Sequence, residues 1–199
     1  CTPDGSMQIV KKLISSHPRG AVVRCLEHEK NKGLSAARNT GISVSVGDYL
    51  YFLDSDDYIP ANAIELLAEA ARQKQTNFVI GNYEVTGARR WAPPLSLGTG
   101  LYEGNALVLS NYVQEKWYVM AWNKLVSRPF VLQHQLYFQE GIVHEDDLWS
   151  FKLACMAQSM YVVDETTYYY SMQPDSIMRA PSMRNLECRV LVLGYIYDF

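Results

Sequence analysis

The sequence lacks the features that mark several broad classes of protein. Its four cysteines stand apart and form no Cys-x-x-Cys pair, so neither a zinc site nor a disulfide framework is indicated, and reduced cytosolic thiols are the simplest interpretation. Basic residues number 18 against 21 acidic ones, which argues against nucleic acid as the main partner. No apolar run approaches the roughly 18 residues that a membrane-spanning helix requires, and no signal peptide is visible.

Internal repeats, low-complexity segments and a domain linker are also lacking. With 199 residues, of which 48% are apolar, the chain is long enough to bury one substantial core, so we expect a single domain. Residues 1–6 have the composition of a turn with no strand before it. This predicts that an N-terminal piece precedes them in the natural protein.

Hydrophobic spacing predicts alternating strands and helices. The first half is expected to form helices at 7–15, 36–46 and 60–73 and strands at 21–26, 49–53 and 78–83. An irregular excursion follows at 86–100, then helices at 103–116, from 129, at 148–157 and at 182–199, with strands at 122–127, 160–163 and 166–172. The alternation predicts an α/β fold with a mostly parallel sheet flanked by helices.

An acidic cluster directly follows the predicted strand at 49–53, where Asp54, Asp56 and Asp57 fill three of four positions. Ligands of open α/β sheets bind beyond the carboxyl ends of strands. On an extended backbone Asp54 and Asp56 would point the same way, and two such carboxylates repel unless a proton or cation lies between them. Oxygen ligands of this kind suit Mg²⁺ or Mn²⁺, and such an ion usually binds one or two carboxylates together with the phosphates of a substrate. The cluster therefore predicts a metal–diphosphate site. The alternative is that the aspartates only cap the next turn and helix.

A second acidic cluster, residues 144–147, precedes the predicted helix at 148–157. Carboxylates at a helix N-terminus are stabilised by unpaired N–H groups and the helix dipole, so simple capping is one interpretation. The other is a general base that takes the proton of an attacking hydroxyl beside the metal site. His144 is a candidate metal ligand, although a lone histidine is more often structural.

Several motifs together resemble those of a known enzyme family. They are Asn31-x-Gly33-Leu34-Ser35-Ala36-Ala37-Arg38-Asn39-x-Gly41, Gly47-Asp48-Tyr49, Phe52-Leu53-Asp54-Ser55-Asp56-Asp57, Trp122-Asn123-Lys124-Leu125, Phe138-x-Glu140-Gly141, His144-Glu145-Asp146, and Tyr168-Tyr169-Tyr170 with Ser176-Ile177-Met178-Arg179. Their order and spacing resemble the core of family 2 glycosyltransferases, which have the GT-A fold, and especially the bacterial members that build surface polysaccharides.

The resemblance implies roles for the acidic residues. Asp54-Ser55-Asp56 would be the Asp-x-Asp motif that binds a nucleotide-sugar donor, with Asp56 holding Mn²⁺ or Mg²⁺ on the diphosphate and Asp54 toward the ribose or sugar. Asp146 would be the catalytic base, with Glu145 orienting the acceptor or donor. The implied reaction is an inverting, in-line transfer to an acceptor hydroxyl, in which the cation stabilises the leaving nucleoside diphosphate.

The resemblance also assigns two arginines and a division of the chain. Arg38 would lie near the nucleotide, and Arg179, with Ser176, on a loop that closes over the donor. Residues 1–85 would bind the nucleotide-sugar, residues 86–180 the acceptor and the catalytic base, and residues 181–199 form a C-terminal helix. Family members begin with a strand–turn–helix unit that supplies much of the nucleotide pocket, and residues 1–6 match only the end of that pattern, so this N-terminal βα unit is expected in the natural protein.

Two rival functions stay open. The first is a nucleotidyltransferase that makes nucleotide-sugars, although it would need a glycine-rich phosphate loop that is not visible here. The second is a non-catalytic nucleotide-sugar-binding subunit. The implied acceptor is a saccharide or a lipid-linked saccharide, and the implied location is the cytoplasm, including the inner face of its membrane.

Aromatic and apolar segments leave further alternatives. Trp91, Trp117, Tyr118 and Trp122 could stack on an acceptor sugar or pack in the core. The resemblance makes Trp91 the best stacking candidate, because the excursion at 86–102 lies where GT-A enzymes vary most for acceptor choice. The apolar residues 190–197 could pack on the core, form a homodimer contact or rest on a membrane surface, and core packing is favoured.

Overall fold

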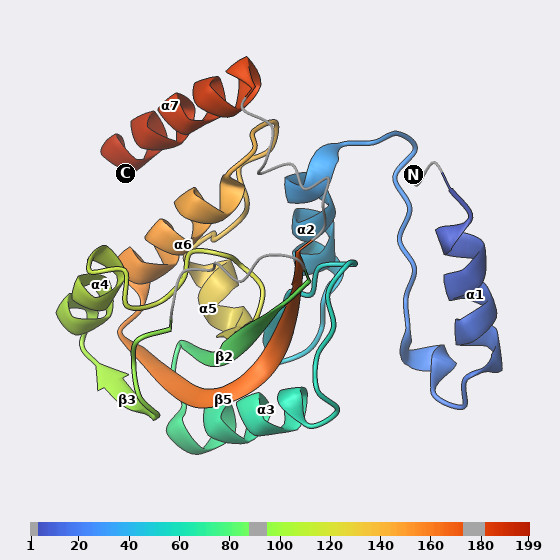
Figure 1. Ribbon diagram of the computed structural model, residues 1–199, viewed down its shortest axis with the longest axis horizontal. Coiled ribbons are helices and arrows are strands. Elements are labelled where there is room, and N and C mark those ends of the chain that lie inside the picture. The colour runs from blue at the N-terminus through green and yellow to red at the C-terminus, as the bar shows by residue number, and fades with distance from the viewer. Residues whose placement is uncertain (1–3, 88–94, 173–181) are drawn as a thin grey trace.

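The computed structural model describes residues 4–87, 95–172 and 182–199 (Figure 1). The elements in chain order are α1 (Ser6–Ser16), the 3₁₀ helix η1 (Gly20–Val22), α2 (Gly33–Val44), β1 (Tyr49–Tyr51), α3 (Ala63–Lys74), β2 (Phe78–Gly87), β3 (Gly100–Glu103), α4 (Asn105–Val113), β4 (Lys124–Ser127), α5 (Arg128–Gln133), α6 (Glu145–Met156), β5 (Ser159–Met172) and α7 (Met183–Tyr197).

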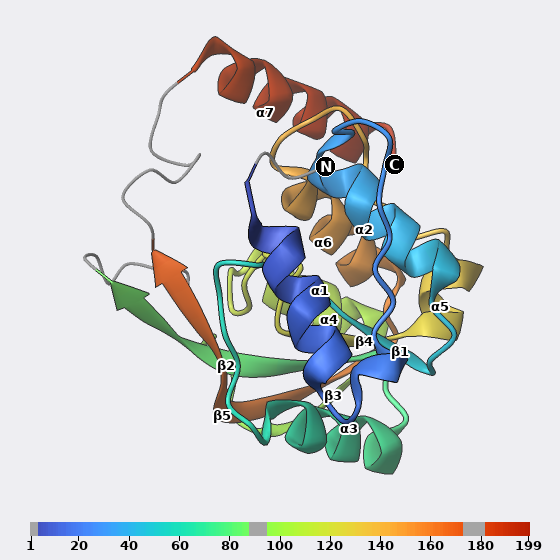
Figure 2. The same cartoon turned by 90° about the vertical axis from the view of Figure 1, so that its right-hand side faces the viewer.

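The sheet has five strands in the order β1-β4-β2-β5-β3. Helix α3 covers one face, and α2, α4, α5 and α6 lie on the other (Figures 1 and 2). The α/β class is therefore confirmed, but the expected mostly parallel pairing is wrong for the described strands, because β2 with β5 is the single parallel pair among neighbouring strands and the other three pairs are antiparallel. Strand β4 runs between β1 and β2, antiparallel to both, and this insertion makes the sheet mixed.

Strand β5 replaces the two short strands predicted at 160–163 and 166–172. Its ladder with β2 contains register shifts on either side of Asn82, so the pairing continues across the break that the sequence pattern indicated. The backbones approach closely here: a Cβ on Gly81 would lie 1.8 Å from Thr167 Oγ1. Glycine is therefore needed at this crossing.

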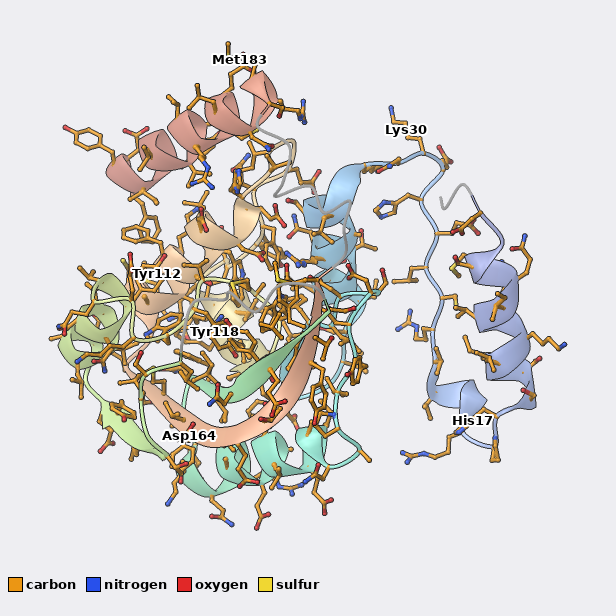
Figure 3. The ribbon with its side chains drawn as sticks, in the orientation of Figure 1. His17, Lys30, Tyr112, Tyr118, Asp164 and Met183 are labelled. Atoms are coloured by element: carbon orange, nitrogen blue, oxygen red, sulfur yellow. The ribbon has the colours of Figure 1, made fainter. Side chains whose placement is uncertain are left out.

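The N-terminal arm, α1 with η1 and the extended segment after it, stands away from the sheet (Figure 1). Helix α1 has the amphipathic pattern that was predicted but buries none of its residues, and Figure 3 shows His17 at the far end of the arm. The strand expected at 21–26 is wrong. A strand requires a neighbour to pair its N–H and C=O groups, and no described strand adjoins this segment, in which Val22 stays 74% exposed.

The main core lies between the sheet and helices α4, α5 and α6. Trp117, Tyr118 and Trp122 are among its most buried side chains, so core packing explains these three and stacking on an acceptor does not. Figure 3 shows Tyr118 inside the body of the molecule. Trp91 lies outside the described residues.

Helix α7 packs against α6 and buries Cys188 and Val192. Five of its other apolar side chains form an exposed stripe, which consists of Met183, Leu186, Val190, Leu193 and Tyr197, and Leu191 and Tyr195 are exposed as well. Core packing therefore accounts for one face of the helix only, and Figure 3 places Met183 at its outer end. Within the described part of the chain, every helix falls short of the length and apolarity that crossing a bilayer requires.

Candidate active site

The first acidic cluster lies at the end of β1 and is built on a turn. The Asp57 N–H donates to the Asp54 carbonyl at 3.2 Å, so residues 54–57 are not extended and the argument from alternating side-chain directions does not apply. Asp54 is half-buried, whereas Ser55 and Asp56 are exposed. No hydrogen bond or ion pair reaches the Asp56 carboxylate from the described residues, which leaves it open to an external ligand.

Asp57 has a structural role. Its carboxylate accepts hydrogen bonds from the Tyr168 hydroxyl at 2.6 Å and the Ser171 N–H at 2.7 Å, both on β5. Tyr58 and Tyr169 extend the contact, since they exchange two backbone hydrogen bonds and stack their rings at 4.7 Å. Asp57 thus ties the turn to β5. Asp54 and Asp56 are the aspartates of this cluster that remain available to bind a ligand.

The second acidic cluster occupies the first turn of α6, which begins at Glu145, three residues before the predicted start. The helix N-terminus favours these carboxylates, as expected. Glu145 is buried, and the Asp146 Oδ2 accepts a hydrogen bond from the Ala121 N–H at 3.2 Å. His144 adopts a left-handed conformation before the helix, and its Nε2 is buried with no hydrogen-bond partner among the described residues.

Arg38, on α2, joins the two clusters. Its Nη2 lies 3.1 Å from Asp54 Oδ1, and its Nη1 lies 3.0 Å from Glu145 Oε1 and 2.5 Å from Asp146 Oδ1. Its side chain is 6% exposed, so these charge-assisted bonds are shielded from water. One guanidinium therefore holds together carboxylates that lie about a hundred residues apart in the chain.

Aromatic rings fix the Arg38 guanidinium from the sides. It lies 5.0 Å from the ring centroid of Phe138 and 6.0 Å from that of Phe52. Asn39 locks the first ring in place, because its amide donates to the Phe138 carbonyl at 2.9 Å and accepts from the Phe138 N–H at 2.8 Å. Two consecutive residues of α2 thus act together: Arg38 provides the charge, and Asn39 holds the segment whose ring packs against it.

Two opposing effects set the pKa values in the cluster: burial and the charge of Arg38. Burial raises the pKa of Asp54, and Arg38 offsets part of this effect. Burial also raises the pKa of Glu145, and Asp146 adds to the rise. For Arg38 burial alone would lower the pKa, but the three carboxylates, led by Asp146, raise it. Three carboxylates that face one guanidinium leave the cluster with an excess of negative charge, which favours a further cation.

Core residues support the strand-end cluster. Trp122 stacks on Tyr168 at 4.4 Å, and the Tyr168 hydroxyl lies 3.3 Å from the Asp54 N–H as well as bonding Asp57. The fully buried Asn123 has a left-handed backbone, and its side-chain oxygen accepts from the hydroxyls of Tyr51 and Thr167. The sheet, not the loops alone, sets the position of the strand-end carboxylates.

The expected divalent cation fits the residues at this position. Among the described residues, the Asp56 carboxylate and the Asp54 Oδ2 have no partner, and these oxygens are the hard ligands that Mn²⁺ and Mg²⁺ prefer. No group of three or more His, Cys, Asp or Glu side chains in the described residues could hold a metal ion. A cation here would need further ligands from a bound diphosphate or water.

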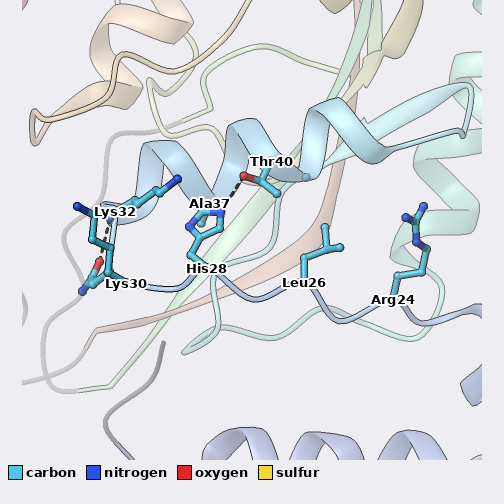
Figure 4. A pocket seen from close by; sticks show the side chains of 10 residues that line it. Arg24, Leu26, His28, Lys30, Lys32, Ala37 and Thr40 are labelled. Atoms are coloured by element: carbon cyan, nitrogen blue, oxygen red, sulfur yellow. Dashed lines mark hydrogen bonds between the residues drawn. The ribbon is translucent and has the colours of Figure 1, made fainter.

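A separate basic hollow of about 310 Å³ lies between α2 and the segment before it (Figure 4). Arg24, Lys30 and Lys32 supply its charge, and His28 Nε2 lies 2.8 Å from Thr40 Oγ1 across it. None of its lining residues belongs to the acidic clusters. The hollow is therefore distinct from the carboxylate site.

Of the predicted site residues, the structure brings together Arg38, Asp54, Glu145 and Asp146, with Ser55 and Asp56 on the adjoining turn. Arg179 lies outside the described residues. The direct pairing of Arg38 with both clusters was missed by the sequence analysis. A usable signal existed: an arginine on the apolar face of a predicted helix needs carboxylate partners, and two orphan acidic clusters were available.

Comparison with known proteins decides the family. Residues 1–128 match the sequence profile of "Glycosyl transferase family 2", which is more than half of the chain. The chain belongs to glycosyl transferase family 2. Among its relatives, "Uncharacterized glycosyltransferase EpsJ" of Bacillus subtilis (strain 168) is 31% identical over 192 residues, a match that covers 90% of this chain and 53% of EpsJ. The chain spans about half the length of the curated relatives it matches.

Two proteins of Staphylococcus aureus are also similar to this chain. "Poly(ribitol-phosphate) beta-N-acetylglucosaminyltransferase TarP" of strain N315 is 26% identical over 150 residues, which covers 74% of this chain and 45% of TarP. The crystal structure of S. aureus TarS 1-349 in complex with UDP-GlcNAc superposes with a TM-score of 0.79 at 19% identity, over all of this chain and 56% of that one. These likenesses confirm the GT-A fold that the sequence motifs predicted.

Proposed function

We propose that the protein to which this family 2 chain belongs transfers a sugar from a nucleotide-diphosphate sugar to an acceptor hydroxyl, with inversion, in the synthesis of a bacterial polysaccharide. The observation that carries the proposal is the Arg38 bridge, which places Asp54 of the donor motif and Asp146, the candidate base, on one guanidinium. Donor binding and acceptor activation then occur in a single site.

The proposed donor half of the site is the turn after β1. Asp56, with Asp54, would hold Mn²⁺ or Mg²⁺, and the cation supplies charge stabilisation for the leaving diphosphate. Ser55, exposed between them, lies within the same donor surface. Arg38 keeps Asp54 oriented by its 3.1 Å contact, so the donor motif is preorganised before any ligand binds.

The proposed acceptor half of the site is the first turn of α6. Asp146 takes the proton of the acceptor hydroxyl while that oxygen forms a bond to the anomeric carbon and the bond to the nucleoside diphosphate breaks. The Ala121 N–H and Arg38 hold the two carboxylate oxygens of Asp146, so its orientation is fixed. Glu145, buried beside it, keeps Arg38 in place.

The substrate class follows from the relatives only as a starting point. TarS was crystallised with UDP-GlcNAc and with UDP, and TarP is named as an N-acetylglucosaminyltransferase of poly(ribitol-phosphate). We therefore expect a UDP-sugar donor and a saccharide or lipid-linked saccharide acceptor. The site is proposed to act on the cytoplasmic side.

The test is release of nucleoside diphosphate by the complete protein from a panel of UDP-sugars with Mn²⁺. Asp146→Asn should lower turnover by about a thousandfold while UDP still binds, because a general base contributes about 10²–10⁴. Asp56→Ala should weaken Mn²⁺-dependent UDP binding itself. Matched controls are Asp147→Asn, one residue from the base and without contact to Arg38, and Asp48→Ala, an exposed aspartate before β1.

The two rival functions predict other outcomes of the same assay. Pyrophosphate in place of nucleoside diphosphate would identify a nucleotidyltransferase. UDP-sugar binding without turnover, and unaffected by Asp146→Asn, would identify a non-catalytic subunit. Either result would overturn the proposal.

A further inference from the structure

Lys124, the first residue of β4, is a fully buried lysine whose motif was noted in the sequence but which has no role in the site described so far. Burying an ammonium group is costly unless hydrogen bonds replace its water. Its Nζ donates to the main-chain carbonyl of Tyr118 at 2.9 Å and to that of Met120. The Tyr118 ring, 4.3 Å away, and the Trp117 ring, 5.5 Å away, cover it further.

The carbonyl of Met120 and the N–H of Ala121 belong to one peptide group. Lys124 binds the oxygen side of that group, and Asp146 Oδ2 accepts from the nitrogen side at 3.2 Å. A peptide is planar, so a bond that fixes its carbonyl direction also fixes the direction of its N–H. A charged or strong donor on the oxygen further polarises the group and strengthens the N–H as a donor.

The rest of the segment is held firmly in the core. The Tyr118 hydroxyl donates to the carbonyls of Gly81 at 2.8 Å and Asn123 at 3.1 Å. The Ser150 hydroxyl, on α6, donates to the carbonyl of Val119. The segment 118–121 therefore has anchors at the sheet and at α6, and Lys124 provides the one nearest the Ala121 amide.

We propose that Lys124 is a positioning residue for Asp146, acting through the Met120–Ala121 peptide. The inference rests on the proposed function, in which Asp146 is the base, and adds a residue that acts through its Oδ2, whereas Arg38 contacts its Oδ1. Burial lowers the pKa of Lys124, and Asp146 offsets part of this effect, which agrees with a coupling between the two groups.

The variant Lys124→Met keeps the length of the side chain and removes its donors. On the complete protein we expect kcat for UDP release to fall by roughly 10–100-fold, since small displacements of a catalytic group carry losses of this order. The KM for the donor and the Mn²⁺-dependent binding of UDP should change less than twofold. Lys74→Met, an exposed lysine on α3, is the matched control and should leave both unchanged.

Amide hydrogen exchange tests the same path without turnover. Lys124→Met should lose protection at the Ala121 amide while β2 stays protected. Lys124→Gln keeps one amide donor and should fall between Met and wild type in both measurements, and it decides the matter if the methionine variant does not fold. Full protection of Ala121 or unchanged kcat in a folded variant would overturn the role of Lys124. Absence of UDP release by the wild type would instead overturn the proposed function, and the exchange result would still judge the structural path.

Discussion

The two acidic clusters stabilise closely spaced carboxylates in different ways. At the end of β1 a turn leaves Asp56 exposed and uses Tyr168 and Ser171 to satisfy Asp57. At the start of α6 the helix N-terminus receives the carboxylates, and Glu145 is buried. Both clusters share Arg38.

The difference shows how local structure gives aspartate and glutamate side chains of similar chemistry different roles. A carboxylate on an open turn remains free to change partners, which suits an ion that arrives and leaves with a substrate. A carboxylate locked in a helix turn is held in one orientation, which suits proton transfer at a fixed distance. Arg38 keeps the two kinds in register, so its loss should affect both.

The largest expected effect is that of Arg38→Met. It removes the single guanidinium from three partly buried carboxylates, and breaking such a pair costs about 3–5 kcal/mol. Urea unfolding should show a loss of this order at neutral pH, together with loss of turnover. Arg72→Met, an exposed arginine of α3, is the control and should stay within about 0.5 kcal/mol of the wild type. Stability within 1 kcal/mol for Arg38→Met would show that the clusters do not depend on the shared cation.

A smaller effect, confined to the strand-end cluster, is expected for Tyr168→Phe. It deletes the 2.6 Å hydrogen bond to Asp57, and a hydrogen bond to a charged group contributes about 1.5–3 kcal/mol. Thermal unfolding should register this loss. Tyr161→Phe is a suitable control, because it lies on the same strand and its contact with Lys74 is to the ring face, which the change preserves. Equal effects for the two variants would contradict a special role for the Asp57 anchor.

The smallest effect is a pH dependence in the helix cluster. The folded-state pKa of Glu145 is raised above its ordinary 4.5 by burial and by Asp146, so its proton-linked stabilisation is complete below pH 4.5 and is lost as pH rises through the raised value. Glu145→Gln cannot titrate, so its unfolding free energy relative to wild type should increase across that window. A carboxyl-carbon NMR titration of Glu145 checks the direction directly, and a pKa below 4.5 would refute it.

Sequence reasoning predicted the described α-helices to within a few residues because they depend on local spacing and caps. Ser182 illustrates this: its side chain accepts from the Asn185 N–H at the start of α7, close to the predicted start. Sequence reasoning failed where a neighbouring strand decides whether and how a segment pairs. Examples are the strand expected at 21–26, which does not form, and the insertion of β4 between β1 and β2. Strand pairing depends on distant residues, and no local pattern records it.

The candidate site shows the same division. Asp54, Asp56 and Asp146 could be found from motif and position, whereas the Arg38 bridge required knowledge of how α2, β1 and α6 meet. The support from Lys124 was also out of reach, since a lysine at the start of a strand is ordinarily exposed. Local chemistry thus identified the groups, and tertiary packing alone supplied their partners. The assignments of domain parts, donor and cation stay predictions.

The spacing of the contacts made by Arg38 has a consequence for biosynthesis. Its three partners follow it by 16, 107 and 108 positions. A ribosome that has delivered α2, β1 and the turn after β1 has therefore synthesised both partners of only one of the three salt bridges, that of Arg38 with Asp54. Until the start of α6 emerges, the growing chain carries an arginine short of two counter-charges, so the candidate site is completed late in translation, well after the first helices can form.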